Sequence, residues 1–129
     1  QQKTVWVPCH GSMLHFRVLD EELYLHHVQR SADVPIGLVS NIAQYAGLLL
    51  VVAKETGYRP AEYMHTLSDA HIYERQIEQV EELLSRDSKP FPKALVSMAL
   101  TNTFDWRKGD ILIEDYEPHP KMRIDTPND

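Results

Sequence analysis

The chain has 129 residues, of which 43% are hydrophobic and 25% charged, which is the size and apolar content of one globular domain. Its formal net charge of −6 argues against a general nucleic-acid binder, because proteins that follow phosphate backbones carry a basic face. The single cysteine excludes an intramolecular disulfide, and the longest apolar run, Ala46 to Ala53, is too short to span a bilayer. We therefore expect a cytoplasmic protein without a membrane or nucleic-acid partner.

The first segments predict strands. Thr4 to Val7 is rich in β-branched and aromatic residues, and Pro8 ends it just before Cys9. Met13 to Leu19 and Leu23 to Val28 alternate as strands do, and an acidic turn separates them. Residues 12–30 are therefore expected to form a hairpin.

A loop and a long helix should follow the hairpin. Ser31 to Gly37 contains Pro35 and Gly37, which favours a loop. Asn41 to Thr56 has apolar residues at helical spacing, with Asn41 placed as an N-cap and Gly57 as a C-cap. The second half of this helix is almost entirely apolar, so we expect it to be buried.

The remaining elements complete an α+β pattern. Glu62 to Thr66 predicts a short strand, and Ala70 to Ser85 predicts an amphipathic helix. Its inward face should hold Ile72, Ile77, Val80, Leu83 and Leu84. A loop over Asp87 to Pro92 precedes strands at Ala94 to Leu100 and Asp110 to Ile113. We expect a mixed or largely antiparallel sheet, covered by the long buried helix and the second amphipathic helix.

Cys9 is the first candidate for chemistry. It follows Pro8 at the end of a predicted strand, a place from which a side chain can project into a cleft. A catalytic cysteine reacts as a thiolate, and a free thiol titrates near ~8.5, so a cationic neighbour is needed. The competing interpretation is a buried structural cysteine, which is the commoner case for a lone cysteine.

A cluster of polar side chains follows the hairpin. Arg30, Ser31 and Asp33 place a guanidinium, a hydroxyl and a carboxylate close together where a strand meets a loop. Arginine and serine suit a phosphate, through charge, fork geometry and an added donor. A surface Arg–Asp ion pair explains the same residues equally well.

Two further groups suit a nucleotide. Asn41 stands at the start of the long helix, where its amide offers a donor and an acceptor to a uracil-like edge, although an N-cap is the simpler interpretation. His71 and Tyr73 are two positions apart, so on an extended backbone they point the same way and can share a sugar hydroxyl. The alternative is a helix start capped by Ser68 or Asp69.

A metal centre is not expected. Seven histidines are present, including the adjacent His26 and His27. Their spacing matches no His-x-x-x-His pair or Cys/His cluster of the kind that binds zinc.

Taken in order, these segments resemble the thymidylate synthase family over nearly the whole chain. The matching runs are Pro8-Cys9-His10, Gln29-Arg30-Ser31-Ala32-Asp33, Gly37 to Asn41, Ile42-Ala43-Gln44-Tyr45-Ala46, His65-Thr66, Asp69-Ala70-His71-Ile72-Tyr73, Leu84-Ser85-Arg86, Pro90-Phe91-Pro92 and Tyr116-Glu117-Pro118-His119-Pro120. Several independent motifs in one order are far more specific than any one of them. The resemblance implies one thymidylate-synthase-like domain over residues 1–129, which we expect to be the C-terminal portion of a longer chain.

The resemblance implies a reaction. Enzymes of this family convert deoxyuridylate (dUMP) to thymidylate, with 5,10-methylenetetrahydrofolate as co-substrate and without a metal. Cys9 would add to C6 of the pyrimidine, and Arg30 would bind the phosphate and keep Cys9 as a thiolate. Ser31 would join the phosphate site, and the backbone at Ala32 and Asp33 would lie close to the nucleotide.

The resemblance also implies the remaining contacts. Asn41 would read the base edge, and His71 and Tyr73 would hold the ribose hydroxyl. The folate would contact Asp33, Ile36 and Gly37. The family forms homodimers whose sheets pack back to back, which predicts a large apolar sheet face built from the 12–30 hairpin.

Several positions depart from the family pattern. Leu38-Val39-Ser40-Asn41 stands where Leu-Pro-Phe-Asn is usual, and Val28 stands in place of a tyrosine. One extra residue separates Cys9 from Arg30, and the C-terminus is polar where the family has an apolar closing segment. Poor closure admits water, which makes a pyrimidine nucleotide 5-hydroxymethylase the second hypothesis. A truncated nucleotide-binding module without turnover is the third.

Overall fold

The hairpin predicted near the N-terminus is confirmed. The computed structural model describes residues 11–126, so the predicted strand at Thr4 to Val7 and Cys9 lie outside the described residues. Strand β1 (Gly11–Leu19) pairs antiparallel with β2 (Glu22–Gln29). Asp20 and Glu21 join them with φ of 50° and 61°, the left-handed backbone of a type I′ turn.

Helix α1 (Val39–Thr56) connects β2 to a parallel partner. A short strand β3 (Ala32–Asp33) and a π-helical turn (Val34–Leu38) lead into α1 where we expected a loop. Gly57 closes the helix with φ of 78°, which confirms the predicted C-cap. Strand β4 (Arg59–Leu67) then pairs parallel with β2, which gives a mixed sheet in the order β1-β2-β4.

The prediction that Asn41 caps this helix is wrong. The π-helical turn continues directly into α1, and the residue at the N-cap position, Leu38, already has helical dihedral angles. Asn41 therefore lies inside the first turn of α1. Its amide is free for contacts other than capping.

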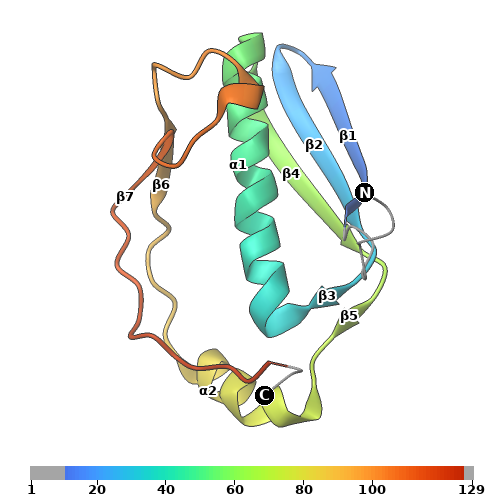
Figure 1. Cartoon of the computed structure of the whole chain (residues 1–129), viewed down its shortest axis with the longest axis vertical. Coiled ribbons are helices and arrows are strands. Elements are labelled where there is room, and N and C mark those ends of the chain that lie inside the picture. Colours follow the sequence, from blue (N-terminus) through green and yellow to red (C-terminus); the bar gives the residue numbers. More distant parts are fainter. Residues whose placement is uncertain (1–10, 127–129) are drawn as a thin grey trace.

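The core lies between α1 and the inner face of the three-stranded sheet. Leu23 and Leu25 of β2 pack against Leu49 and Ala53 of α1, all buried. Phe16 joins this cluster from β1, and Tyr63 joins it from β4. The expectation that α1 covers the sheet is confirmed, as Figure 1 shows.

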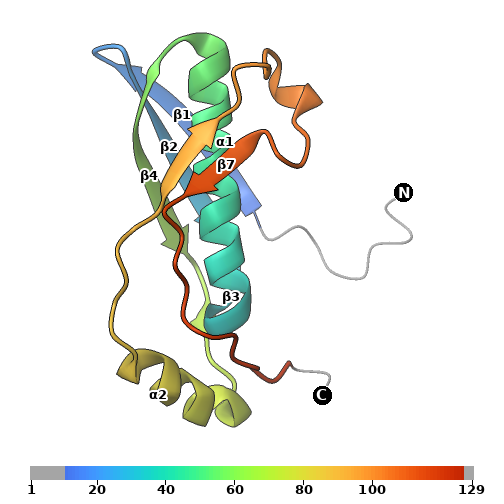
Figure 2. The same ribbon diagram turned by 90° about the vertical axis from the view of Figure 1, so that its left-hand side faces the viewer.

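The opposite side of α1 faces a second hairpin, made of β6 (Lys93–Val96) and β7 (Ile111–Glu114). Figures 1 and 2 show α1 between this hairpin and the larger sheet. Gly47 permits the close approach, because a Cβ there would lie 3.1 Å from Cδ1 of Ile111 and 3.3 Å from Cη2 of Trp106. In this α+β fold, α1 therefore lies between the three-stranded sheet and the β6–β7 hairpin.

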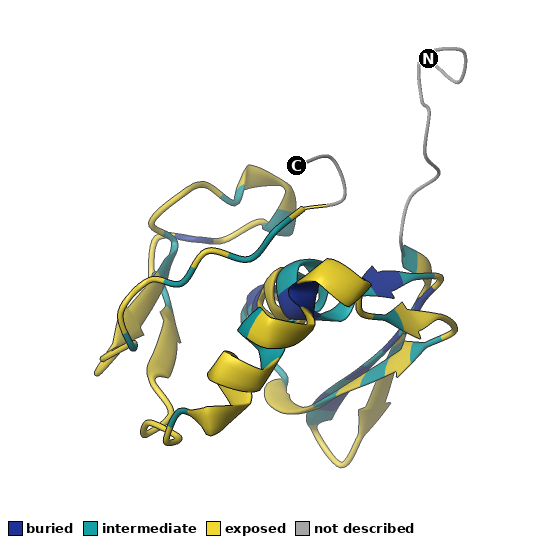
Figure 3. Ribbon diagram, turned by 90° about the horizontal axis from the view of Figure 1, so that it is seen from below, coloured by how far each residue is buried: buried dark blue, intermediate teal, exposed yellow. Residues whose placement is uncertain are grey.

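The predicted helix over Ala70 to Ser85 is only partly helical. Strand β5 (Ala70–His71) pairs parallel with β3, and a 3-10 turn (Glu74–Gln76) precedes α2 (Ile77–Ser85). The prediction that its apolar residues face inward is wrong for most of them: Ile72, Ile77, Leu83 and Leu84 are exposed, and Val80 is half-buried. Figure 3 shows α2 and the second hairpin largely exposed.

The outer face of the larger sheet has no layer over it in residues 11–126. Met13, Leu19 and Met64 are exposed there among His15, Arg17 and Glu62, so this face is mixed rather than apolar as we expected. The aromatic ring of Phe16 packs into the core instead.

The segment Val34–Thr56, by length and composition alone, is long and apolar enough to cross a membrane. Core helices of globular proteins pass the same test. In this fold, its residues Gly47, Leu49, Val51 and Ala53 are buried against the rest of the chain.

Candidate active site

The predicted site residues meet at one edge of the fold. Strands β2 and β4 are parallel, so their carboxyl ends lie together, beside the start of α1 (Figure 1). The short β3–β5 ladder continues from these ends, with Ala32 opposite Ala70 and Asp33 opposite His71. Such an edge is where open α/β sheets usually bind ligands.

A chain of side-chain amides links Asn41 to the sheet. Nε2 of Gln29 donates to Oδ1 of Asn41 at 3.0 Å and to the backbone oxygen of Ser31 at 2.8 Å. Oε1 of Gln29 lies 3.0 Å from Nε2 of His65. Gln29 is only 1% exposed, so each of these bonds replaces water that burial removes.

A second group centres on the Asp69 carboxylate. Oγ of Ser31 donates to its Oδ2 at 3.0 Å, and Nδ1 of His71 donates to the same oxygen at 3.2 Å. The rings of His71 and Tyr73 meet edge to face, with centroids 5.2 Å apart. The predicted proximity of His71 and Tyr73 is confirmed, because the chain is extended here rather than helical.

Arg30 stands exposed beside this group. Within residues 11–126 its guanidinium makes no side-chain hydrogen bond and no ion pair. The alternative of an ion pair with Asp33 is therefore not realised. As far as the described residues go, the donors of Arg30 are therefore available to an anion.

The carboxylate of Asp33 accepts a hydrogen bond from the side chain of Gln76, which is fully buried. Nε2 of Gln76 donates to Oδ2 of Asp33 at 3.2 Å and to the backbone oxygen of Asp125 at 2.9 Å. Oε1 of Gln76 accepts from the backbone N–H of Tyr73 at 3.0 Å. One glutamine thus joins the candidate folate carboxylate, the candidate ribose residue and the C-terminal segment.

A buried cluster of rings supports the site from the core. His27 stacks against His65 with centroids 4.6 Å apart and against Tyr45 at 3.7 Å, and its Nδ1 lies 3.2 Å from the Tyr63 hydroxyl. Burial lowers the pKa of both histidines, and their mutual proximity lowers that of His27 further. Burial also raises the pKa of Tyr63 to about 12. The cluster is therefore neutral at pH 7.

Two ring nitrogens in this cluster have no hydrogen-bond partner in the part of the chain that the structure describes. They are Nε2 of His27 and Nδ1 of His65. The first faces Gly11, where an added Cβ would lie 3.1 Å from that nitrogen and 2.8 Å from the Tyr45 hydroxyl. A larger residue at this position, at the end of β1 that pairs with Gln29, would therefore force the Tyr45 hydroxyl to shift.

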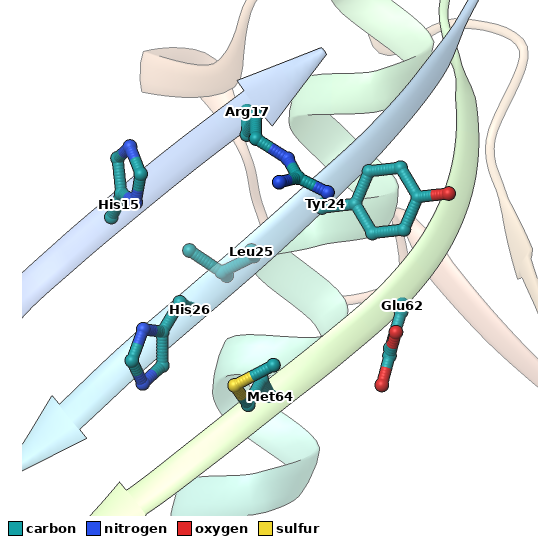
Figure 4. A pocket seen from close by; sticks show the side chains of 7 residues that line it. All are labelled: His15, Arg17, Tyr24, Leu25, His26, Glu62 and Met64. Carbon is teal, nitrogen blue, oxygen red and sulfur yellow. The ribbon is translucent and has the colours of Figure 1, made fainter. Parts of the chain in front are cut away.

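A separate hollow of about 200 Å³ lies on the outer face of the sheet, away from these residues. Figure 4 shows its lining from three strands, with α1 behind them: His15, Arg17, Tyr24, Leu25, His26, Glu62 and Met64. The Arg17 guanidinium sits over the Tyr24 ring at 5.2 Å. None of the predicted nucleotide or folate residues lines this hollow.

The structure thus brings Ser31, Asp33, Asn41, His71 and Tyr73 to one edge, with Arg30 beside them. Ala32 is buried in the short ladder, and Ile36 and Gly37 are half-buried in the π-helical turn. Cys9 lies outside the described residues.

Sequence reasoning assigned no role to Gln29, His65 or Gln76. The first two lie in matching segments, which was a usable signal. Gln76 lay inside a predicted helix and gave none.

This edge combines a cation without a side-chain partner among residues 11–126, a hydroxyl that donates to a carboxylate, two neighbouring rings and an oriented amide. The cation and the hydroxyl suit a phosphate, the two rings suit a sugar hydroxyl, and the amide suits a base edge. A family model described as Thymidylate synthase matches residues 1–127, which is nearly the full length. The chain therefore belongs to the thymidylate synthase family.

Proposed function

We propose that this chain methylates deoxyuridylate at C5 to give thymidylate, through a covalent adduct of Cys9. The observation that carries the proposal is the gathering of Arg30, Ser31, Asn41 and His71 at the carboxyl ends of two parallel strands. Membership of the thymidylate synthase family supports it.

The phosphate and sugar contacts follow from the Asp69 group. Arg30, whose guanidinium makes no side-chain bond among residues 11–126, is followed in sequence by Ser31, whose hydroxyl donates to Asp69. His71 is oriented through Nδ1 by the same carboxylate, which leaves its Nε2 for a ribose hydroxyl. Tyr73, in ring contact with His71, supplies a second group on the same side.

Cys9 is the proposed nucleophile. It precedes Gly11 by two positions in the sequence, and Gly11 pairs with Gln29 at this edge. The positive charge of Arg30 favours the thiolate. The Cys9 sulfur would add to C6 of the pyrimidine, which makes C5 nucleophilic toward a one-carbon donor.

The folate side of the site is proposed at Asp33, Ile36 and Gly37. When bound, 5,10-methylenetetrahydrofolate supplies the one-carbon unit and the reducing equivalents. Gln76 fixes the Asp33 carboxylate and leaves it lone pairs for a pterin N–H. At Gly37 an added Cβ would meet only Oδ1 of Asn41, at 3.8 Å, so the backbone is open to a flat ring. These residues fit the co-substrate.

One observation favours pyrimidine nucleotide 5-hydroxymethylation as a second candidate. The C-terminal segment reaches the folate side through the Asp125 carbonyl, and it carries Arg123 and Asp125, whose side chains lie 3.6 Å apart. A charged closing segment retains water. Water could then hydrate the one-carbon unit on the pyrimidine before it is reduced.

A homodimer and a cytoplasmic location belong to the same proposal. The outer sheet face, uncovered in the described residues, has both apolar side chains and opposite charges for a second copy, with Arg17 and Glu62 lining one hollow. Sedimentation velocity on the full chain tests the dimer, and Met64→Asp should shift it toward monomer.

Trapping with 5-fluorodeoxyuridylate and methylenetetrahydrofolate tests the function. The wild-type chain should form a covalent ternary adduct at Cys9, and Cys9→Ala should form none. Equal labelling of both proteins rules the assignment out. With deoxyuridylate as substrate, a methyl product with dihydrofolate supports the first candidate, and a hydroxymethyl product without dihydrofolate supports the second. Nucleotide binding with no product identifies a binding module.

A further inference from the structure

We infer that His65 is a positioning residue, which holds the Gln29 carboxamide in one orientation. Gln29 in turn fixes the orientation of the Asn41 amide. The fixed amide makes the site prefer a pyrimidine with a keto oxygen at C4. The inference rests on the proposed function, since it names the base that the nucleotide site accepts. It is carried by three hydrogen bonds of the Gln29 side chain in β2: to Asn41 in α1, to His65 in β4 and to the backbone oxygen of Ser31.

The orientation of Gln29 is fixed by a backbone oxygen. The carbonyl of Ser31 can only accept, so the end of the Gln29 carboxamide at 2.8 Å must be its N–H end. The carboxamide oxygen then points the other way, to within 3.0 Å of His65. Because Gln29 is buried, that oxygen needs a donor to replace water.

His65 must be that donor. An amide oxygen offers no proton, so Nε2 of His65 carries the hydrogen that joins them. In a neutral ring Nδ1 is then a bare acceptor, and it is the buried nitrogen that lacks a partner among residues 11–126. Burial lowers the pKa of His65, which favours the neutral ring, and the bond to the Gln29 oxygen then places the single proton on Nε2.

Gln29 passes the orientation on to Asn41. Its second N–H donates to Oδ1 of Asn41 at 3.0 Å. Turning the Asn41 amide over would place two N–H groups against each other, which removes the bond and adds repulsion. Within the described residues Nδ2 of Asn41 makes no hydrogen bond, so its donors, and the second lone pair of Oδ1, remain for a ligand.

The locked amide matches one pyrimidine edge. Uracil presents an acceptor at O4 and a donor at N3–H, which complement Nδ2–H and Oδ1 of Asn41. Cytosine presents the reverse, an amino group at C4 and a bare N3. Cytosine would be bound well only with Asn41 turned over, against the bond from Gln29. Base preference therefore depends on His65, although His65 touches no base.

Three variants of the full chain test the hydrogen bonds from His65 through Gln29 to Asn41. The affinities for deoxyuridylate and deoxycytidylate are measured by titration calorimetry. His65→Phe keeps a flat ring against His27 but removes the donor. His65→Gln restores an N–H. Tyr63→Phe is the matched control, because its hydroxyl belongs to the same buried cluster but contacts His27 instead of Gln29.

We expect wild type, His65→Gln and Tyr63→Phe to prefer deoxyuridylate, and His65→Phe to lose roughly tenfold of that preference. An unchanged preference in folded His65→Phe overturns the inference while the proposed function stands. If His65→Phe does not fold, Gln29→Leu serves instead, since it frees the Asn41 amide to turn and should cause the same loss.

Ring-nitrogen NMR of the nucleotide-free protein provides a test that does not need binding. His65 should show a protonated Nε2 and an unprotonated Nδ1. The opposite tautomer overturns the inference, even if deoxyuridylate binds. A wild-type chain that binds neither nucleotide contradicts the proposed function, and the tautomer then still decides whether His65 donates to Gln29.

Discussion

Helix α1 is packed differently on its two sides. Toward the three-stranded sheet it meets Leu23 and Leu25, which are almost fully buried. Toward the β6–β7 hairpin and α2, large apolar side chains stay exposed, with Leu84 at 78% and Phe91 at 96%. The polar groups of the candidate site are attached to the first side, where packing fixes their positions. Stability and site geometry should therefore both depend on that side.

The largest expected effect on stability comes from shortening a buried side chain between α1 and the three-stranded sheet. Leu25→Ala should lower the free energy of unfolding by about 2–5 kcal/mol, because it leaves a cavity between β2 and α1. Urea unfolding followed by circular dichroism measures the change. A loss below about 1 kcal/mol would mean that this side is no better packed than the other.

A medium effect on stability is expected where α1 approaches the β6–β7 hairpin. Gly47→Val should destabilise the fold by about 1–3 kcal/mol, since its side chain would displace Ile111 and Trp106. Ala43→Val is the matched control on an exposed turn of the same helix and should cost about 0.5 kcal/mol through helix propensity alone. Equal losses in both variants would contradict the close contact of α1 with β7.

A smaller effect follows from the buried histidines. The pKa values of His27 and His65 are lowered in the fold, so below pH ~6.5 the unfolded chain binds protons that the folded chain does not. Stability should be constant above that pH and fall below it, with a slope of up to about 1.4 kcal/mol per pH unit for each histidine.

Unfolding midpoints across pH 5–8 measure this fall. His65→Gln should make the slope shallower, and His15→Gln, on the exposed outer face, should leave it unchanged. Hydrogen bonds from Tyr24 and Arg59 lower the pKa of the Glu22 carboxyl. Its protonation therefore affects stability only below pH ~4.5, outside the range of this experiment. A flat profile from pH 8 to 5 would show that the two rings are hydrated.

The smallest effect is expected on the exposed side. Leu84→Ala in α2 should change the free energy of unfolding by less than about 0.5 kcal/mol. The same urea experiment as for Leu25→Ala measures it. A loss above about 1.5 kcal/mol would mean that Leu84 is covered in solution, for example by a second copy of the chain.

The sequence predicted the packed side well and the exposed side less well. Alternation in the 12–30 hairpin and the apolar run in α1 are strong local signals, and both elements formed as expected. The amphipathic pattern over Ala70 to Ser85 is equally clear, yet pairing of Ala70 and His71 with β3 makes its start extended. Tertiary pairing there overrides local preference.

Within the site, residue identity was easier to predict than orientation. The family motifs named Asn41, His71 and Tyr73 as site residues, and the structure brings these three to one edge. The N-cap interpretation of Asn41 failed because nothing local shows that a π-helical turn will extend α1 backwards. The bonds from Gln29 and Gln76 join residues far apart in the chain, so no spacing rule could reveal them.

The parallel pairing of β2 with β4 also has a consequence for how the chain folds. Glu22 lies opposite Arg59, and all of α1 stands between them in sequence. The β1–β2 hairpin and α1 need only local contacts and can form within microseconds. The pairing of β4 with β2 comes later, because the whole segment between the two strands must first be ordered. The entropy of closing that segment is lost before any β2–β4 hydrogen bond forms to offset it. The edge that holds the candidate site, at the far end of that pairing, is therefore expected to assemble last.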